Sequence, residues 1–507
     1  MGYARITAVG LVGVTGHLVT VEAHVDRGQA RVVLSGLPDA VLGQARDRVR
    51  SALVNSGFHW PDQRIAINLL PASLPKHGSS FDLAIALVLL VASGQLPPPL
   101  IDGIVPIGEL GLDGRLRPVP GVLPALMAAR ESRLRAAVVA PGNLREAALV
   151  SGLTVHGSPD LRRLTAGLAG QGEMLPVPEL DAESEDHSPD LADVVGQDAA
   201  KRALEISAAG GHNLMLLGPP GVGKTMLAER LPPLLPRLDD ASAMEVTAIH
   251  SIAGQFEKRA ALLRRAPFQA PHHSASMPAL VGGGSGVPRP GALSLAHCGV
   301  LFLDELPEFR RDVIDALRQP LESGIINIHR SAAVVRFPAR VLLMLAANPC
   351  PCAAPKPADC ECSAMARGRY RAKLKGPLMD RVDLHVRLQP VGRSALLGDE
   401  PAPEDSRAVA ERVSRAREAA AARWESAGCG RIPNSQVAGA RLRARPWRLP
   451  STVLGVADWM LDSGRLSARG YDRVQRLAWS IADLAGRDRP DENDLGEAVE
   501  LRLGHKV

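Results

Sequence analysis

Residues 213–225 read NLMLLGPPGVGKT, and this stretch decides the fold class. The run from Asn213 to Leu217 predicts a short buried strand, and a helical pattern begins at the end of the stretch. Between strand and helix lies the spacing G-x-x-x-x-G-K-[ST], which is typical of a phosphate-binding loop. The loop consists of Gly218, Pro219, Pro220, Gly221, Val222, Gly223, Lys224 and Thr225.

The residue types of this loop indicate its chemistry. Glycines let the backbone curl so that its N–H groups and the helix amino terminus face phosphate oxygens. Lys224 neutralises charge on the β- and γ-phosphates, and the Thr225 hydroxyl is a ligand for Mg²⁺. The sequence therefore predicts ATP and Mg²⁺ as cofactors. The alternative is a chance glycine-rich turn before a helix.

Carboxylates follow the next predicted buried strand, in the stretch GVLFLDELPEF (residues 299–309). We expect Asp304 to complete the Mg²⁺ site and Glu305 to be the base that polarises the attacking water. Together they predict hydrolysis, although a solvated acidic pair is the alternative. The strand at 341–346 leads to Asn348, which can bridge the γ-phosphate and the water or can be a simple turn residue.

The pattern of elements predicts three folded regions and a linker. Strand-like and helix-like segments alternate up to residue 170, and residues 171–189 are a Gly-, Pro- and acid-rich linker. In residues 190–392, buried strands separated by helices, one of them over Arg311–Glu322, predict a parallel sheet covered on both faces. Ala/Arg-rich helices fill most of 393–507. The expected fold class is multidomain α/β.

The composition is that of an ordinary folded protein. Of 507 residues, 46% are hydrophobic and 22% are charged, and no apolar run is long enough to span a membrane. Only six cysteines occur, which excludes a disulfide-stapled secreted scaffold and favours the cytoplasm. The formal net charge of +5 permits nucleic-acid binding without requiring it.

Several separate motifs resemble one known family. The stretches GPPGVGKT, LFLDELPEF, LAANPCPC, GPLMDRVDLHV and LSARGYDRVQRLA are together similar to the magnesium-chelatase-like AAA+ ATPases of the ComM/YifB type. The resemblance spans nearly the whole chain. It implies a Lon-protease-like α+β domain of the ribosomal S5 type at the amino terminus, a central AAA+ domain and a carboxyl-terminal helical lid.

The resemblance also implies a homo-oligomeric ring, most simply a hexamer, with sites between subunits. It makes Arg381 the arginine finger that reaches the γ-phosphate in the neighbouring subunit, and Arg469 the sensor-2 arginine of the lid. A fixed guanidinium suits the spread charge of a phosphoryl-transfer transition state. Each could instead be a surface arginine of an Arg-rich chain, and Arg473 competes with Arg469.

An inserted segment precedes Asp304. Asp304 follows Thr225 by 79 residues, and the stretch 268–297 resembles the helix-2 insert of chelatases and related motors. Such inserts project toward a central pore, where the glycines at 282–284 could follow a polymer backbone. The adjacent His272 and His273 are alternatively metal ligands, but we expect adjacent side chains to point in different directions.

Four cysteines form the pattern C-x-C-x₇-C-x-C directly after Asn348. They are Cys350, Cys352, Cys360 and Cys362. Two thiolate pairs in one loop could hold a tetrahedral ion, and zinc is the natural candidate. Its role would be structural, between Asn348 and Arg381. The alternative is a set of reduced, solvent-facing thiols.

The stretch LPKHGSSFDLAIALVLL (residues 74–90) resembles Lon and aligns Ser80 with its nucleophile. A serine nucleophile needs a positioned base. Leu123 occupies the position of the Lon lysine, no lysine occurs between residues 77 and 200, and Lys76 is too close in the motif to replace it. We therefore expect no peptidase, and we interpret Ser80 as a helix-start residue.

The resemblance implies a motor that remodels DNA, by branch migration or helicase action, in recombination during natural transformation. No helix-turn-helix, zinc-finger or RRM signature supports DNA binding independently. A chelatase motor that inserts Mg²⁺ or Co²⁺ into a tetrapyrrole is the first alternative, although the chain has no D-x-S-x-S motif. An ATP-dependent protease is a second alternative, but this chain lacks the lysine that the protease needs. A σ54-type activator is a third, but this chain has no GAFTGA motif.

Overall fold

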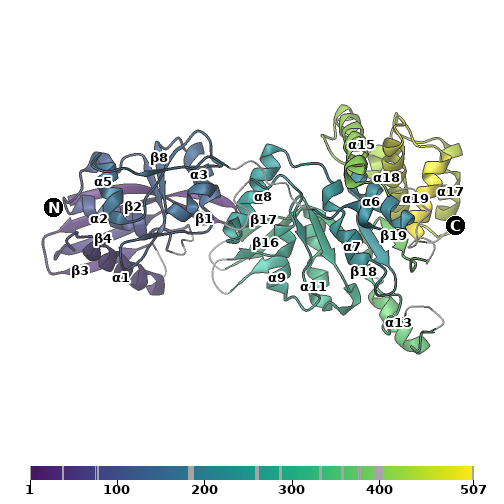
Figure 1. Ribbon diagram of the computed structural model, residues 1–507, viewed down its shortest axis with the longest axis horizontal. Coiled ribbons are helices and arrows are strands. Elements are labelled where there is room, and N and C mark those ends of the chain that lie inside the picture. Colours follow the sequence, from purple (N-terminus) through teal and green to yellow (C-terminus); the bar gives the residue numbers. More distant parts are fainter. Residues whose placement is uncertain are drawn as a thin grey trace.

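Figure 1 shows the computed structural model, in which three parts follow one another along the long axis. The amino-terminal part lies at one end, the phosphate-binding strand and its sheet lie in the middle, and the carboxyl-terminal helices lie at the other end. No helix in the described part of the chain is both long and apolar enough to cross a membrane. The structure describes residues 2–36, 39–74, 76, 79–180, 188–256, 262–284, 288–330, 334–354, 359–374, 376, 378–392 and 403–504.

The amino-terminal part contains two four-stranded sheets, ordered β1–β2–β4–β3 and β10–β9–β8–β5. Helix α2 is buried at every residue, because its sequence DLAIALVLLVA carries a single polar side chain. The strands are β1 (Gly2–Val12), β2 (Thr15–Asp26), β3 (Arg31–Ser35), β4 (Arg64–Leu70), β5 (Ile104–Ile107), β8 (Ala136–Val139), β9 (Thr154–Gly157) and β10 (Leu175–Pro176). The helices include α1 (Asp39–Asn55), α2 (Asp82–Ala92), α3 (Val122–Glu131), α4 (Leu144–Ala147) and α5 (Leu161–Leu168).

The start of α2 differs from the sequence prediction. Ser80 was expected to begin this helix, but the residue at its N-cap is Phe81, which makes no side-chain cap. The first-turn carboxylate of Asp82 is instead buried and accepts a hydrogen bond of 2.7 Å from Nε of Arg48. The start of the helix is therefore held by a tertiary ion pair and not by a local serine cap, which a local pattern cannot reveal.

The middle part is a five-stranded parallel sheet with the order β12–β15–β18–β11–β19. Its central strands are uninterrupted apolar runs, as expected for strands covered on both faces. The strands are β11 (Leu214–Leu217), β12 (Phe268–Gln269), β15 (Val300–Leu303), β18 (Leu342–Ala347) and β19 (Leu384–Arg387). The helices around it include α6 (Asp198–Gly210), α7 (Lys224–Glu229), α8 (Asp240–Ile252) and α10 (Ala292–Leu295).

The helix predicted over Arg311–Glu322 is two helices, α11 (Arg311–Ala316) and α12 (Arg318–Ser323). The cause is Pro320, which has no N–H and whose ring would clash with the carbonyl group four residues earlier. That carbonyl belongs to Ala316, where α11 ends.

Two hairpins extend from the middle part. They are β13–β14 (Gly282–Gly283 and Arg289–Pro290) and β16–β17 (Ile325–His329 and Val334–Pro338), with helix α9 (Met277–Val281) before the first. Arg330 donates a hydrogen bond to the carbonyl of Gly284, so the hairpins meet. Gly13, in the β1–β2 turn, has φ +61°, and a Cβ there would lie 2.4 Å from the carbonyl oxygen of Arg336. The amino-terminal part therefore packs directly on the second hairpin.

The carboxyl-terminal helices share one hydrophobic core with the sheet. Leu214 and Leu216 of β11 belong to the same buried cluster as Trp424 and Trp479. The four helices predicted there are α15 (Ser406–Ser426), α17 (Ser451–Asp462), α18 (Ala468–Leu484) and α19 (Glu492–Leu503), with the short α16 (Gly439–Arg443) between them. Helix α13 (Ala364–Lys373) lies apart and projects away from the body (Figure 1).

Candidate nucleotide site

The predicted phosphate-binding loop lies at the carboxyl end of β11. Gly223, with φ +93°, turns the chain into α7. The Lys224 ammonium donates hydrogen bonds to the carbonyls of Gly218 at 2.8 Å and Pro219 at 2.9 Å. It also donates to Oδ1 of Asn348 at 2.9 Å. Burial lowers the pKa of Lys224. The structure thus brings the predicted lysine and asparagine together.

The predicted Mg²⁺ ligands also lie together. The Thr225 hydroxyl donates to Oδ2 of Asp304 at 2.9 Å. Strands β11, β18 and β15 are parallel neighbours, so the residues that follow them meet at one edge of the sheet. Oδ1 of Asp304 accepts from the backbone N–H of Glu305 at 2.8 Å, which fixes the carboxylate.

The loop residues fit a phosphate. No backbone or side-chain acceptor in the described part of the chain takes a hydrogen bond from the N–H groups of residues 221–225. A Cβ at Gly221 would have no atom within 4 Å, so the loop is open on that side. Unpaired N–H groups at a helix amino terminus attract anions. The Lys224 ammonium, held by neutral oxygens, supplies the compensating charge.

Sequence reasoning missed a histidine at this site. Nδ1 of His273 lies 2.9 Å from Oε2 of Glu305, and Glu305 has the left-handed backbone angle φ +52°. Contrary to the prediction that His272 and His273 diverge, their ring centroids lie 4.0 Å apart. His272 instead pairs with the Ser274 hydroxyl at 2.8 Å. No spacing in the sequence signals the contact, because it depends on β12 lying beside β15.

The predicted arginine finger lies at the opposite edge of the sheet. Leu214 pairs with Leu384 and Leu217 with Arg387 in parallel register. Arg381 precedes β19, and its carbonyl accepts from Nδ2 of Asn213 at 2.8 Å. The paired strand residues separate the two edges by about 10 Å, at ~3.3 Å per residue.

The Arg381 side chain is only 14% exposed and forms an ion pair with Glu322, at the end of α12. Arg381 and Lys224 therefore lie at opposite ends of two neighbouring strands. Arg381 precedes β19, and Lys224 follows β11. The backbone of Arg381 therefore does not lie at the edge that carries the phosphate-binding loop of its own chain.

The two candidate lid arginines have different surroundings. Arg469 is exposed in the first turn of α18. Arg473 forms an ion pair with Asp383, whose carboxylate also lies 3.3 Å from Nδ1 of His212. Burial alone would raise the pKa of Asp383, but His212 and Arg473 hold it below its usual value. Arg473 is thus committed to a buried network, and Arg469 is available to a partner.

The four cysteines of the C-x-C pairs gather at one point. Their sulfur atoms all lie within 4.8 Å of one another. Sγ of Cys350 is 3.2 Å from that of Cys352, and Sγ of Cys360 is 3.6 Å from both. Hydrogen bonds within the cluster, first from Cys350, lower the pKa of Cys352 to about 6.

A second group of potential ligands is a closed structural network. Nε2 of His297 lies 2.9 Å from Oε2 of Glu245, and Nδ1 accepts from the backbone N–H of Arg340 at 3.0 Å. Cys298, beside them, has its pKa raised to about 11, chiefly by burial. Both ring nitrogens are engaged, so this group is not a candidate metal centre.

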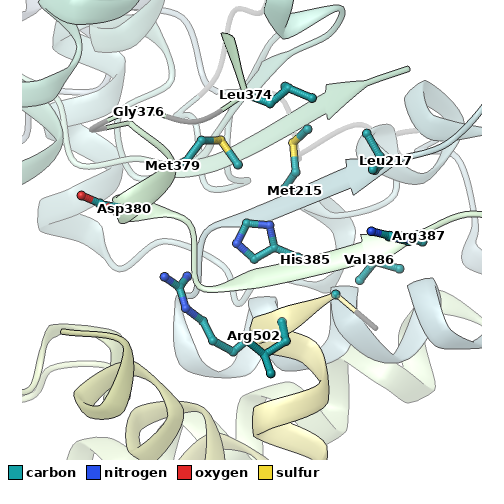
Figure 2. A pocket seen from close by; sticks show the side chains of 12 residues that line it. Met215, Leu217, Leu374, Gly376, Met379, Asp380, His385, Val386, Arg387 and Arg502 are labelled. Carbon is teal, nitrogen blue, oxygen red and sulfur yellow. The ribbon is translucent and has the colours of Figure 1, made fainter. Parts of the chain in front are cut away.

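A cavity of about 400 Å³ lies on the other face of the sheet from α7. Figure 2 shows His385 of β19 and Arg502 of α19 at one side, with Met215 and Met379 opposite. Burial and the nearby Arg502 lower the pKa of His385 to about 4. No residue of the phosphate-binding loop lines this cavity, so it is separate from the nucleotide site.

Known proteins resemble this chain over nearly its full length. It is 42% identical to the competence protein ComM of Haemophilus influenzae, over 99% of this chain and 98% of that protein. It is 41% identical to YifB of Escherichia coli, over 97% of this chain and 95% of that protein. The chain belongs to the magnesium-chelatase-like family of ComM and YifB. An uncharacterised protein of Mycobacterium tuberculosis is 47% identical over 99% of both chains.

Three family models match successive parts of this magnesium-chelatase-like protein. They are "Subunit ChlI of Mg-chelatase" over 21–143, "Magnesium chelatase, subunit ChlI" over 190–396 and "Magnesium chelatase, subunit ChlI C-terminal" over 403–502. Membership supports an AAA+-type ATPase and implies the use of ATP and Mg²⁺. The open loop beside Lys224, with Thr225 and Asp304 in contact, fits both groups.

A weaker likeness connects the amino-terminal part with Lon protease of Chloroflexus aurantiacus. Identity is 28% over 148 residues, which are 27% of this chain and 17% of that protein. Ser80, the residue that aligns with the Lon nucleophile, has no lysine hydrogen-bonded to it among the described residues. Lys76 donates to the carbonyls of Pro71 and Leu74 instead.

Proposed function

We propose that the chain forms a homo-oligomeric ring in the cytoplasm, most simply a hexamer, that couples ATP hydrolysis to the remodelling of DNA. The observation that carries the ATPase part is the convergence of Lys224, Asn348, Thr225 and Asp304 at one edge of the sheet. The position of Arg381 at the opposite edge of the sheet supports the proposed ring. Branch migration or strand separation is the form of remodelling that we propose.

Each residue at the nucleotide site has a task that its contacts support. The N–H groups of residues 221–225 and the Lys224 ammonium bind phosphate oxygens. Thr225 and Asp304 hold Mg²⁺, which supplies charge compensation when it is bound. Asn348, which contacts Lys224, orients the attacking water. Glu305 accepts a proton from this water after its carboxylate has broken the contact with His273.

A neighbouring subunit completes this site. Arg381 lies at the edge remote from its own Lys224, and Arg469 is exposed in the helical lid. A guanidinium delivered by the next subunit stabilises the charge that spreads over the transferred phosphoryl group. In the single chain, Glu322 holds the Arg381 guanidinium, so ring closure must exchange this ion pair for the phosphate.

DNA is the proposed polymer substrate. The relative ComM is named a competence protein, and competence concerns uptake of DNA. The two hairpins of the middle part meet through Arg330 and Gly284, and they carry the exposed Arg289 and Arg336. Gly282 must be glycine because a Cβ would lie 2.7 Å from the carbonyl oxygen of Arg289. We propose that these basic hairpins contact the phosphate backbone of DNA as it passes through the ring.

The test is ATP turnover by the purified protein alone, with forked DNA and with a four-way junction. DNA should raise turnover, and a labelled four-way junction should be resolved only when ATP is present. The descriptions of the matching family models favour a chelatase motor as second candidate. If DNA does not change ATP turnover and the protein binds no DNA at low salt, the chelatase motor becomes the favoured function. A porphyrin-insertion assay would then test it.

We also propose that the cysteine cluster holds one structural zinc ion. Four thiolates around a tetrahedral Zn²⁺, with Zn–S of about 2.3 Å, place sulfurs about 3.8 Å apart. The observed separations of 3.2–3.6 Å between three of the sulfurs are close to that value. Elemental analysis of reduced protein should give one zinc per chain, and Cys350→Ser with Cys352→Ser should release it. Absence of tightly bound metal would leave four ordinary thiols.

A further inference from the structure

Helix α13 projects from the middle part beside the nucleotide site (Figure 1). We propose that α13 is a contact surface for the phosphate backbone of DNA, and that its base transmits this contact to the hydrolysis site. The proposal rests on the proposed function and names a DNA-binding surface of that motor in addition to the two hairpins.

The charge of α13 is of one sign. Four basic side chains and no acidic one occur in the ten residues Ala364–Lys373, and these four are exposed. They are Arg367, Arg369, Arg371 and Lys373. Among the described residues, Arg367 and Arg371 have neither an ion pair nor a side-chain hydrogen bond. No ion pair within the described part of the chain therefore compensates the charge of these two arginines, which favours a polyanionic partner.

The arrangement on the helix suits a close approach to a backbone. Arg367 and Arg371 are four residues apart and lie on one flank of the helix, about 6 Å from each other. Arg369 lies on the other flank. Between the flanks runs an exposed line of small residues, and a Cβ at Gly368 would meet no atom within 4 Å. Small side chains along this line leave room for a strand of DNA between the arginines of the two flanks.

The opposite side of α13 anchors it to the catalytic residues. Tyr370 is 6% exposed, and its hydroxyl lies beside the backbone of Asn348, whose effect is to lower the pKa of Tyr370. Burial raises the pKa of Tyr370 to about 12, so the hydroxyl stays protonated. The Lys373 ammonium donates to the carbonyl of Pro307 at 2.8 Å. Pro307 lies two residues after Glu305. The base of α13 is therefore next to Asn348 through Tyr370 and close in sequence to Glu305 through Lys373.

Four cysteines of the chain between Asn348 and α13 gather at one point. The Ser363 hydroxyl caps α13 by accepting from the N–H of Ala366 at 3.1 Å. In this proposal α13 is a lever: a force on its arginines is transmitted through Tyr370 to Asn348, and DNA contact is thereby coupled to ATP hydrolysis.

The first experiment measures DNA affinity against salt for the full-length protein. The variant Arg367→Ala with Arg371→Ala should reduce the slope of log K against log salt by about two, since each phosphate contact contributes about 0.9. The loss should be equal for DNA of different sequences, because phosphate contacts carry no sequence information. The matched control is Arg162→Ala with Arg415→Ala, which removes two exposed arginines from α5 and α15 and should leave the slope unchanged.

The outcomes separate this proposal from the proposed function. If the wild type binds DNA and the Arg367/Arg371 variant has the same slope, α13 is not a contact surface, while the DNA motor stands. If the wild type binds no DNA at low salt, both proposals fail. An equal loss in the control would show a general charge effect and would also overturn the assignment of the surface to α13.

The second experiment tests the transmission. Tyr370→Phe removes only the hydroxyl that meets Asn348, so the variant should bind DNA with wild-type affinity but lose most of the rise in ATP turnover that DNA causes. Tyr471→Phe is the control, because it removes a hydroxyl that bonds Asp458 at 2.7 Å in the helical lid. Normal DNA stimulation in Tyr370→Phe would overturn the lever, and so would an equal loss in Tyr471→Phe.

Discussion

Nδ1 of His273 lies 2.9 Å from Oε2 of Glu305, at the point where the inserted segment approaches the nucleotide site. The proposed base is therefore in contact with an imidazole. His273 precedes the β13–β14 hairpin by nine residues, so the hairpin and the base are connected by a short piece of chain. We expect this contact to restrain Glu305.

Replacing His273 by Ala should raise ATP turnover in the absence of DNA. The hydrogen bond that Glu305 must break has a net value of about 1 kcal/mol. Its loss corresponds to a rate increase of about fivefold. His272→Ala is the control, because His272 bonds Ser274 and not the carboxylate. A fall in turnover specific to His273→Ala would show that the imidazole orients the base productively.

Lys224→Ala and Glu305→Gln should fail in different ways. Loss of the Lys224 ammonium removes the charge that compensates the phosphates and should abolish tight ATP binding. Glu305→Gln keeps the loop intact and should bind ATP without hydrolysing it. Equilibrium binding of a fluorescent ATP analogue, measured beside turnover, distinguishes the two. Wild-type turnover in Glu305→Gln would exclude this residue as the base.

Arg381→Ala should lower kcat by about a thousandfold, as for other arginine fingers, with little effect on ATP binding by a single chain. Because we propose that Arg381 acts on the next subunit, mixing Arg381→Ala with Lys224→Ala chains should restore part of the activity. Some interfaces in the mixed rings then combine an intact loop with an intact finger. Mixed rings without any recovery would assign the finger to its own chain or to another residue.

The half-buried His385 should make the fold acid-sensitive. Its pKa is about 4 in the folded chain, chiefly because of burial, whereas an unfolded histidine titrates near 6.5. Below about pH 6.5 the unfolded chain takes up a proton that the folded chain rejects, so stability should fall from about pH 6.5 to pH 4. His385→Gln should remove up to ~3 kcal/mol of this fall.

Chemical unfolding at pH 7, 5.5 and 4 measures the effect of His385. The exposed His17 supplies a control, His17→Gln, whose pH dependence should match that of the wild type. An unchanged pH dependence in His385→Gln would mean that this imidazole is not buried in the neutral form.

Two kinds of site residue can be predicted from the sequence. The first are close together along the chain, and the second directly follow strands of the core sheet. The phosphate-binding loop is contiguous, and the parallel sheet then brings Asp304 and Asn348 to it. The contacts that were missed depend on tertiary placement. Tyr370 and His273 meet their partners only because of the neighbours that α13 and β12 have in the fold.

Other differences between the predicted and the observed elements have separate causes. Pro320 divides one predicted helix into two, and the pattern of apolar residues around it gave no sign of the break. The start of α2 depends on Arg48, which is 34 residues distant from Asp82. The basic residues of α13 are visible in the sequence, but only the fold shows that this helix projects from the body (Figure 1).

The opposite placement of Lys224 and Arg381 has a consequence for symmetry. A twofold dimer uses the same surface patch on both subunits, so it could complete a site only if the loop and the finger lay within one patch. Head-to-tail association completes one site at each interface, and only a closed ring leaves no subunit unpaired. An open chain of the same subunits always carries one idle loop at one end and one idle arginine at the other.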